Sequence, residues 1–183
     1  MDYYTLVKFI HIVAAMIWLG GGFTLMLLSL QAERSADPEA VVRSLRSVTH
    51  LGNQLFVPTA LITLISGLVM AWFWVGFRDL WIIIALAGFA GTFLMGAAVL
   101  KPAADRMIAD VARDGVTPAI LQDGRRLLRF GRFDYALMLV VVADMVFKPA
   151  YGDVAVPLAM GIFLAASAAF FLLPRREIRA AAA

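Results

Sequence analysis

The first apolar stretch of the chain contains a histidine, although a polar ring is costly in a membrane. This stretch, LVKFIHIVAAMIWLGGG (residues 6–22), also contains Trp18 and three consecutive glycines. On a helix, His11, Ala15, Trp18 and Gly22 share one face, whose small residues let another helix or a planar cofactor come close. A neutral imidazole is a common ligand of haem iron and other transition metals. His11 is therefore either such a ligand or a hydrogen-bonding partner of a Ser, Thr or backbone carbonyl on a neighbouring helix.

A second group of reactive side chains lies near the end of a later apolar run, in VVVADMVFKPAYGD (residues 140–153). Asp144 and Lys148 are four residues apart, so a helix would place them on one face, where they can form an ion pair. The pair would either fix the end of the helix or handle protons or substrate. Met145 lies at a depth close to that of His11, and its thioether is either a packing group or an axial ligand for haem iron.

The other histidine, His50, lies beside Asn53 and Gln54, near the membrane surface opposite to His11. The rise of a helix places the two histidines roughly 20 Å or more apart in depth, which is too far for one metal ion to join them. We therefore interpret His50 as an interfacial residue.

The elements that must position these residues are membrane-spanning helices. Hydrophobic residues make up 62% of the 183 residues, and they lie in long runs without the alternation of barrel strands. We expect five spans, at about residues 4–30, 51–75, 80–100, 133–148 and 154–173. The predicted fold is an all-α polytopic bundle with a four-helix core over residues 1–150. Residues 151–183 would add a fifth span and a basic tail.

The basic residues predict how the chain is oriented. Five spans place Lys8, Arg78 and Lys148 on one side of the membrane and the remaining 13 of the 16 basic residues on the other. By the positive-inside rule, the N-terminus lies outside and the C-terminus in the cytoplasm of a bacterium, with the chain in the inner membrane. The net charge of only +3 argues against a nucleic-acid partner, and the absence of cysteine excludes disulfides and thiolate metal sites.

The loops on the basic side are expected to contain helices. Asp37 followed by Pro38 is a typical helix start, and this helix should run into the second span. The segment 101–115 is amphipathic and should end at its glycine, and Thr117 should cap the next helix.

Other features of the spans indicate packing and anchoring. Small-residue stripes in the second and third spans are typical of close helix contact, and Pro58 is expected to kink the second span. Trp72, Trp74 and Trp81 lie at one boundary and form an expected aromatic belt.

The residues of the first and fourth spans resemble those of a bacterial membrane family. A histidine followed by Trp-x-Gly-Gly, and a closing Met-x-x-Lys-Pro, are the pattern of a predicted integral membrane family, domain of unknown function 2269. The matching residues are His11, Trp18, Gly20, Gly21, Met145, Lys148 and Pro149. The first-helix pattern is also similar to that of HemJ-type protoporphyrinogen oxidases and of the CopD copper-resistance domain. The resemblance covers about residues 4–149.

The resemblance to the HemJ-type enzymes implies a b-type haem. It implies that His11 is the axial ligand. In the haem-binding hypothesis, Met145 or Lys148 would be the sixth ligand or its neighbour. In the same hypothesis, Trp18 and the run of Gly20, Gly21 and Gly22 would give the macrocycle room.

One departure from those enzymes concerns the substrate. They have a basic residue soon after the tryptophan that enters the third helix, whereas no Lys or Arg follows Trp81 in LWIIIALAG. This difference argues against porphyrinogen oxidation and leaves haem binding less affected.

Three hypotheses follow for the function. The first is a haem-binding electron-transfer protein or oxidoreductase with a porphyrin- or quinone-like partner, in which Asp144 and Lys148 move protons. The second is a copper- or metal-handling protein or a small-solute transporter, with metal bound at His11 and methionines. The third is a non-catalytic scaffold subunit of a membrane complex. In each of the three hypotheses the chain can form a homo-oligomer.

Overall fold

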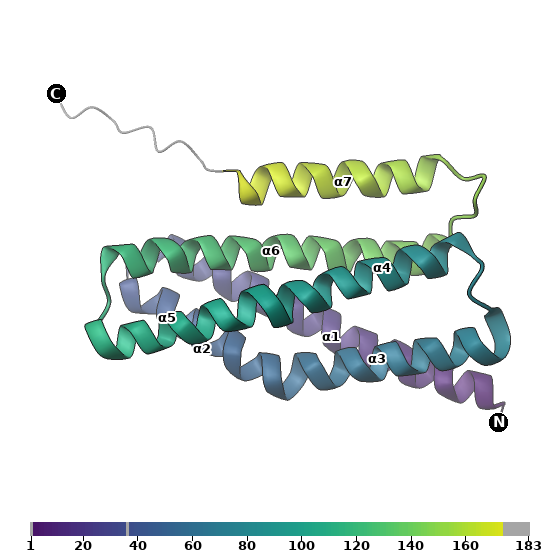
Figure 1. Cartoon of the computed structure of the whole chain (residues 1–183), viewed down its shortest axis with the longest axis horizontal. Helices are drawn as coiled ribbons and strands as arrows, with labels where there is room; N and C mark the ends of the chain where they lie inside the picture. Colours follow the sequence, from purple (N-terminus) through teal and green to yellow (C-terminus); the bar gives the residue numbers. More distant parts are fainter. Residues whose placement is uncertain (1, 36, 174–183) are drawn as a thin grey trace.

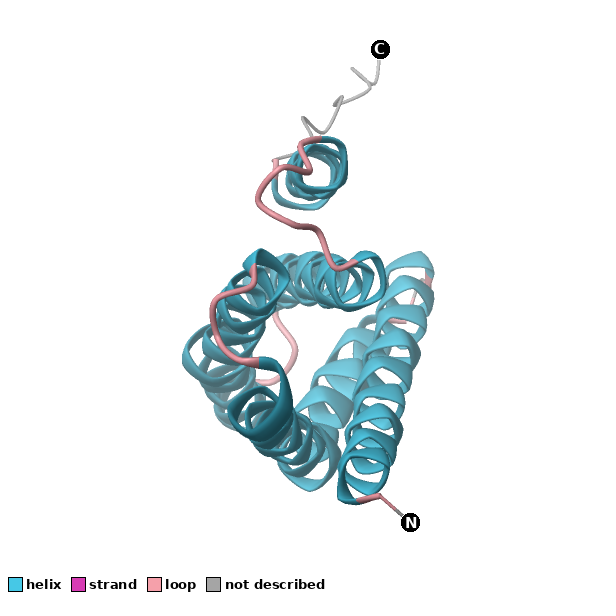
Figure 2. Cartoon of the chain, turned by 90° about the vertical axis from the view of Figure 1, so that its right-hand side faces the viewer, coloured by secondary structure: helices cyan, strands magenta, loops and turns pink. Residues whose placement is uncertain are grey.

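The regular elements of the chain are all helical, as predicted, within residues 2–35 and 37–173, which the computed structural model describes. They are α1 (Tyr3–Arg34), α2 (Pro38–Leu51), η1 (Gly52–Phe56), α3 (Val57–Met70), η2 (Ala71–Val75), α4 (Leu80–Leu94), η3 (Met95–Leu100), α5 (Lys101–Asp114), α6 (Pro118–Phe147) and α7 (Ala155–Leu172). The elements from α1 to α6 form a bundle, and α7 lies outside it against α6 (Figures 1 and 2).

Four helical stretches of the described chain are long and apolar enough to cross a membrane: Tyr3–Arg34, Glu39–Val75, Leu80–Asp114 and Ala155–Leu172. Helix α6 has the length of a span, but its apolar half also carries Arg132, Asp134 and Asp144. The predicted polytopic membrane bundle is therefore confirmed, and α6 differs from the other long helices in the charges that it carries.

The long helices extend well beyond the thickness of a bilayer. Glu39–Val75 has 37 residues, which corresponds to ~56 Å of helix against ~30 Å of hydrocarbon. The expected loop helices are thus continuations of the spans. Helix α6 begins at Pro118, as the cap at Thr117 predicts, and continues through the span expected from about residue 133. The extensions share a core of buried side chains, Ala32, Val41, Leu45, Ala104, Met107, Leu127 and Leu128.

Two of these continuous helices contain a π-helical segment just before a proline. η1 precedes Pro58 in α3, and η3 precedes Pro102 in α5. Proline lacks an N–H group and its ring clashes with the carbonyl four residues earlier, so the hydrogen-bond ladder must change there. The irregularity expected at Pro58 is therefore a π-helical segment inside a continuous helix.

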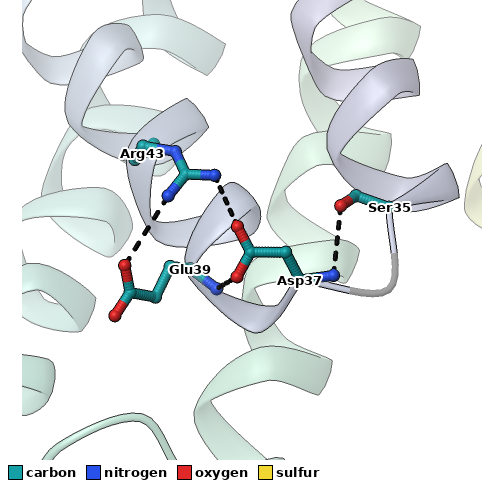
Figure 3. Close-up of polar contacts among 4 residues, drawn as sticks. All are labelled: Ser35, Asp37, Glu39 and Arg43. Atoms are coloured by element: carbon teal, nitrogen blue, oxygen red, sulfur yellow. Dashed lines mark hydrogen bonds and ion pairs between the residues drawn. The ribbon is translucent and has the colours of Figure 1, made fainter.

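The helix starts near the basic loops are capped as the sequence predicts. Asp37 accepts a hydrogen bond of 2.9 Å from the Glu39 backbone N–H, and the Arg43 guanidinium binds the same carboxylate (Figure 3). The Arg43 hydrogen bond holds the pKa of Asp37 below its usual value. Thr117 caps α6 by accepting from Ile120 N–H at 3.3 Å, and α5 ends at Gly115, whose φ is 75°.

A buried arginine ties α6 to α1. Arg132 donates to Ser29 Oγ at 2.8 Å, to the Ser29 carbonyl at 3.2 Å and to Glu33 Oε2 at 2.7 Å. The Arg132 side chain is 5% exposed and that of Glu33 is 27% exposed. Three charge-assisted contacts compensate for the burial of the guanidinium and fix the register of the two helices.

The two ends of the bundle differ in charge. One end carries the N-terminus, the η2–α4 turn and the α6–α7 loop, with Lys8, Arg78 and Lys148 (Figure 1). The other end carries the last turn of α1, α2, α5 and the first half of α6, where the other basic residues of the described chain lie. Arg175, Arg176 and Arg179 of the expected tail lie outside the described residues. The structure thus shows the segregation of basic residues that the sequence predicted.

Candidate functional site

A cavity of about 480 Å³ lies between α1, α3, α4 and α6 and is lined by His11, and we call it the His11 cavity. Helix α3 packs on α1 and α4 packs on α6, and the cavity lies between these pairs. Its walls are mostly apolar and include Trp18, Trp81 and Phe89. Its size falls within the range of roughly 300–1,000 Å³ that is usual for ligand sites.

The His11 ring is held by the backbone of α3. Nδ1 lies 2.8 Å from the carbonyl oxygen of Thr63 and 3.2 Å from Ser66 Oγ. A carbonyl oxygen only accepts, so Nδ1 carries the proton and donates it. In this tautomer the lone pair is on Nε2, which is the arrangement found in metal-ligating histidines whose other nitrogen is anchored.

A glycine makes room for this ring. A methyl group added at Gly67 would lie 3.1 Å from His11 Cε1 and 3.4 Å from Nδ1. The stripe Thr59, Thr63, Gly67 therefore serves both for packing of α3 on α1 and for seating the imidazole. The hydrogen-bonding alternative for His11 is present in the structure, and it leaves Nε2 free for a ligand.

Met145 and two lysines line the same cavity. Met145 comes from α6, Lys8 from α1, and Lys148 follows the last turn of α6. The Lys148 ammonium lies 5.0 Å from the centre of the Trp81 ring, and that of Lys8 lies 5.9 Å from the centre of the Tyr4 ring. These cation–π contacts place two positive charges at one end of the cavity.

The expected ion pair between Asp144 and Lys148 does not form. Helix α6 ends at Phe147, and Lys148 adopts a left-handed conformation with φ of 45°. The turn takes Lys148 off the helix face and toward Trp81, although its backbone N–H still donates to the Asp144 carbonyl at 2.8 Å. Spacing of four residues predicts a pair only while both residues remain helical.

Asp144 is fully buried behind this cavity wall. Its relative exposure is 0%, and within the described chain neither carboxylate oxygen has a hydrogen-bond partner. Asp144 is not among the residues that line the His11 cavity, whereas its neighbour Met145 is. The two predicted catalytic residues are therefore close in sequence, but only Lys148 faces the cavity.

Gly21 and Gly22 of the first helix lie at contacts between helices and outside the His11 cavity. Gly21 is against Leu55 and Gly22 is against Tyr135 and Met138, where added methyl groups would lie 3.0 Å and 2.9 Å from the nearest atoms. Their small size therefore serves helix packing in the structure. Gly22 and Trp18 also line a second cavity.

The second cavity, of about 230 Å³, lies nearer the basic end of the bundle, and we call it the Asp134 cavity. Leu127, Gly131, Asp134 and Met138 of α6 line it at helical spacing. The Oδ1 atom of Asp134 is buried and has no hydrogen-bond partner within the described chain. Trp18 and Phe89 line both cavities, and their ring centroids are 5.6 Å apart.

The sequence reasoning missed Asp134 and the buried Arg132, although periodicity carries a signal for both. Leu128, Arg132 and Ala136 recur every four residues and all are buried. Asp134 lies on the face of Leu127 and Met138. Extending the apolar stripes of α6 through its charged positions would have placed both side chains inside the bundle.

The remaining histidine does not join the site. His50 is exposed at the end of α2, away from the His11 cavity. Within residues 2–35 and 37–173, no three His, Cys, Asp or Glu side chains gather in a group that could hold a metal ion.

Comparison with known families identifies the chain at the level of its architecture. The family model described as predicted integral membrane protein (DUF2269) matches residues 5–149. The chain belongs to this family. The match covers most of the chain, agrees with the resemblance expected from its motifs and ends before α7. No curated protein and no solved structure matches the chain.

Proposed function

We propose that the His11 cavity binds a b-type haem and that the protein transfers electrons in the membrane. The observation that carries the proposal is the anchored imidazole. The Thr63 carbonyl fixes the Nδ1–H tautomer of His11 and leaves the Nε2 lone pair for an iron ion. When bound, the haem would supply one-electron redox chemistry.

The aromatic walls and the positive charges of the His11 cavity also support haem binding, in addition to the imidazole of His11. Trp18, Trp81 and Phe89 provide flat apolar surfaces for a macrocycle. Lys8 and Lys148 are the cations of the lining, and they would pair with the two carboxylates of the haem. Two cations at one end of an otherwise apolar cavity are the expected complement of such an amphipathic dianion.

The other predicted site residues take roles that follow from their positions. Met145 lines the cavity, and its thioether would be available as a further ligand of the iron. Asp144 is buried one residue away from Met145, and its carboxyl group would be able to hold a proton there. A relationship to the HemJ-type enzymes would agree with this assignment of His11.

The test is the visible absorption spectrum of detergent-purified protein from cells supplied with a haem precursor, oxidised and reduced with dithionite. We expect a Soret band and sharpened α and β bands in the wild type, because low-spin haem gives both. His11→Ala should lose at least about 90% of the bound haem, since the ligand bond dominates retention of the cofactor.

His50→Ala is the matched control, because it removes the other histidine from an exposed position. It should keep the full haem content, and circular dichroism should show helical folding of both variants. A colourless wild-type protein, or full haem content in His11→Ala, would overturn the proposal. Metal bound without porphyrin would favour the metal-handling hypothesis, and fixed copurification of a partner by a colourless protein would favour a scaffold.

A further inference from the structure

The Asp134 cavity has an unsatisfied polar group among mostly apolar walls. Its walls are mostly aliphatic and aromatic, and Asp134 Oδ1 is buried there without a hydrogen-bond partner in the described chain. Lys101 also lines the cavity, but its ammonium is paired with Asp105 at 2.8 Å. Buried acceptors in proteins are normally satisfied, so the arrangement calls for a donor from a ligand or water.

The backbone around this cavity is irregular on two sides. Phe56 comes from η1, and Gly96 and Leu100 come from η3, so both π-helical segments that precede prolines contribute to the lining. π-Helical segments inside long helices occur frequently at functional sites. A methyl group added at Gly96 would meet nothing within 4 Å, which shows open space at this wall.

The position of the cavity relates it to the His11 cavity. Trp18 and Phe89 form part of both linings, with ring centroids 5.6 Å apart. Ligands in the two cavities would therefore be separated by these two aromatic side chains. The arrangement suits a pair of redox partners better than a single extended ligand, because the Trp18 and Phe89 rings lie between the spaces.

We propose that the Asp134 cavity binds the head group of a lipid-soluble quinol, one ring hydroxyl of which donates a hydrogen bond to Asp134 Oδ1. The ring matches the apolar walls, and a neutral donor satisfies the acceptor without bringing a second charge into the bundle. The choice of a quinol over another hydroxylated ring rests on the proposed function, since a quinol is an electron donor and the neighbouring cavity is the redox site.

The first test compares a short-chain benzoquinol with its dimethyl ether, which has the same ring but no hydroxyl donor. Anaerobic calorimetric titration of detergent-purified protein should show about tenfold tighter binding of the quinol by the wild type. Asp134→Leu should remove this preference because it removes the acceptor. Asp134→Asn keeps a carbonyl acceptor and should retain most of it. Equal binding of the two compounds by the wild type, or an unchanged preference in Asp134→Leu, would overturn the proposal.

The second test locates the ligand with one filling substitution in each cavity. Gly96 lines only the Asp134 cavity and Ala15 only the His11 cavity, so Gly96→Leu and Ala15→Leu each add bulk to the lining of one cavity. Gly96→Leu should lower quinol affinity at least about tenfold, whereas Ala15→Leu should leave it within about twofold. The reverse pattern would place the quinol in the His11 cavity and contradict the assignment.

Binding of the quinol to the Asp134 cavity should not depend on the haem content of the protein. Quinol binding should be the same in His11→Ala as in the wild type, because His11 does not line the Asp134 cavity. Haem loss in His11→Ala with intact quinol binding would support both proposals. A colourless wild-type protein that still prefers the quinol would overturn only the haem assignment. A haem-loaded protein without that preference would overturn only the quinol site.

Discussion

At the scale of single residues, the seating of His11 depends on the absence of a side chain at Gly67. A methyl group there would lie 3.1 Å from His11 Cε1, and the branches of a valine would reach further into the ring. Gly67→Val should therefore push the imidazole away from the Thr63 carbonyl and lower haem occupancy at least about tenfold, as second-shell changes at metal ligands commonly do. Haem per protein, measured from the Soret band, checks this expectation.

Gly20→Val is the matched control on the neighbouring helix. Nothing lies within 4 Å of a methyl group added at Gly20, so this substitution should leave the haem content unchanged. Equal haem content in both variants would show that the position of the His11 ring does not matter for binding.

The residue scale also shows where spacing alone was insufficient. Apolar periodicity placed His11 and Trp18 on one face of α1, and the structure has both in the lining of one cavity. The partner of His11 is a backbone carbonyl of Thr63, which no side-chain pattern can reveal. Lys148 leaves the α6 face because its φ is 45°, so a rule for helical neighbours did not apply to it.

At the scale of elements, the contact between α1 and α6 depends on Arg132. Arg132→Ala would leave Glu33 and Ser29 without their buried partner, so we expect a loss of about 3 kcal/mol in the free energy of unfolding. Glu33→Gln keeps a neutral acceptor and should cost less, about 1 kcal/mol. Unfolding in mixed micelles with increasing dodecyl sulfate, followed by circular dichroism, measures both.

Arg43→Ala controls for the loss of an arginine as such. The ion pairs of Arg43 join side chains that are 45–75% exposed, and such pairs contribute little because water already solvates the charges. Its unfolding curve should coincide with that of the wild type. If Arg132→Ala behaved in the same way, the buried contact would not be what fixes α6 on α1.

Element boundaries were predictable where local chemistry sets them. Asp37, Thr117 and Gly115 begin or end helices as expected because capping groups and a positive φ act within a few residues. Thr117 predicted the start of α6, but hydropathy placed the membrane span only from about residue 133, because the first half of α6 is amphipathic and packs on α2 and α5 outside the apolar span. Hydropathy identifies the part of a helix in lipid and gives no signal for the part beyond it.

At the scale of the whole molecule, the composition was enough to predict a helical membrane bundle, but not the cavities. Each cavity is lined by residues of α1, α3, α4 and α6. Its volume depends on how α3 packs on α1 and how α4 packs on α6. A single sequence contains no information on the distances between these helices beyond the small residues at their contacts. The charge difference between the two ends, by contrast, follows from the order of the spans and can be tested directly.

The positive-inside rule predicts that the end with Lys8, Arg78 and Lys148 faces outward. The natural chain has no cysteine, so single cysteines report on orientation without background. Gly152→Cys lies in the exposed α6–α7 loop and Val116→Cys in the exposed α5–α6 loop, at opposite ends of the bundle. In intact bacterial spheroplasts, a membrane-impermeant maleimide should label Gly152→Cys and should label Val116→Cys only after permeabilisation. The opposite labelling would place the His11 end of the bundle in the cytoplasm, and a quinol bound at Asp134 would then lie nearer the outer surface than the haem.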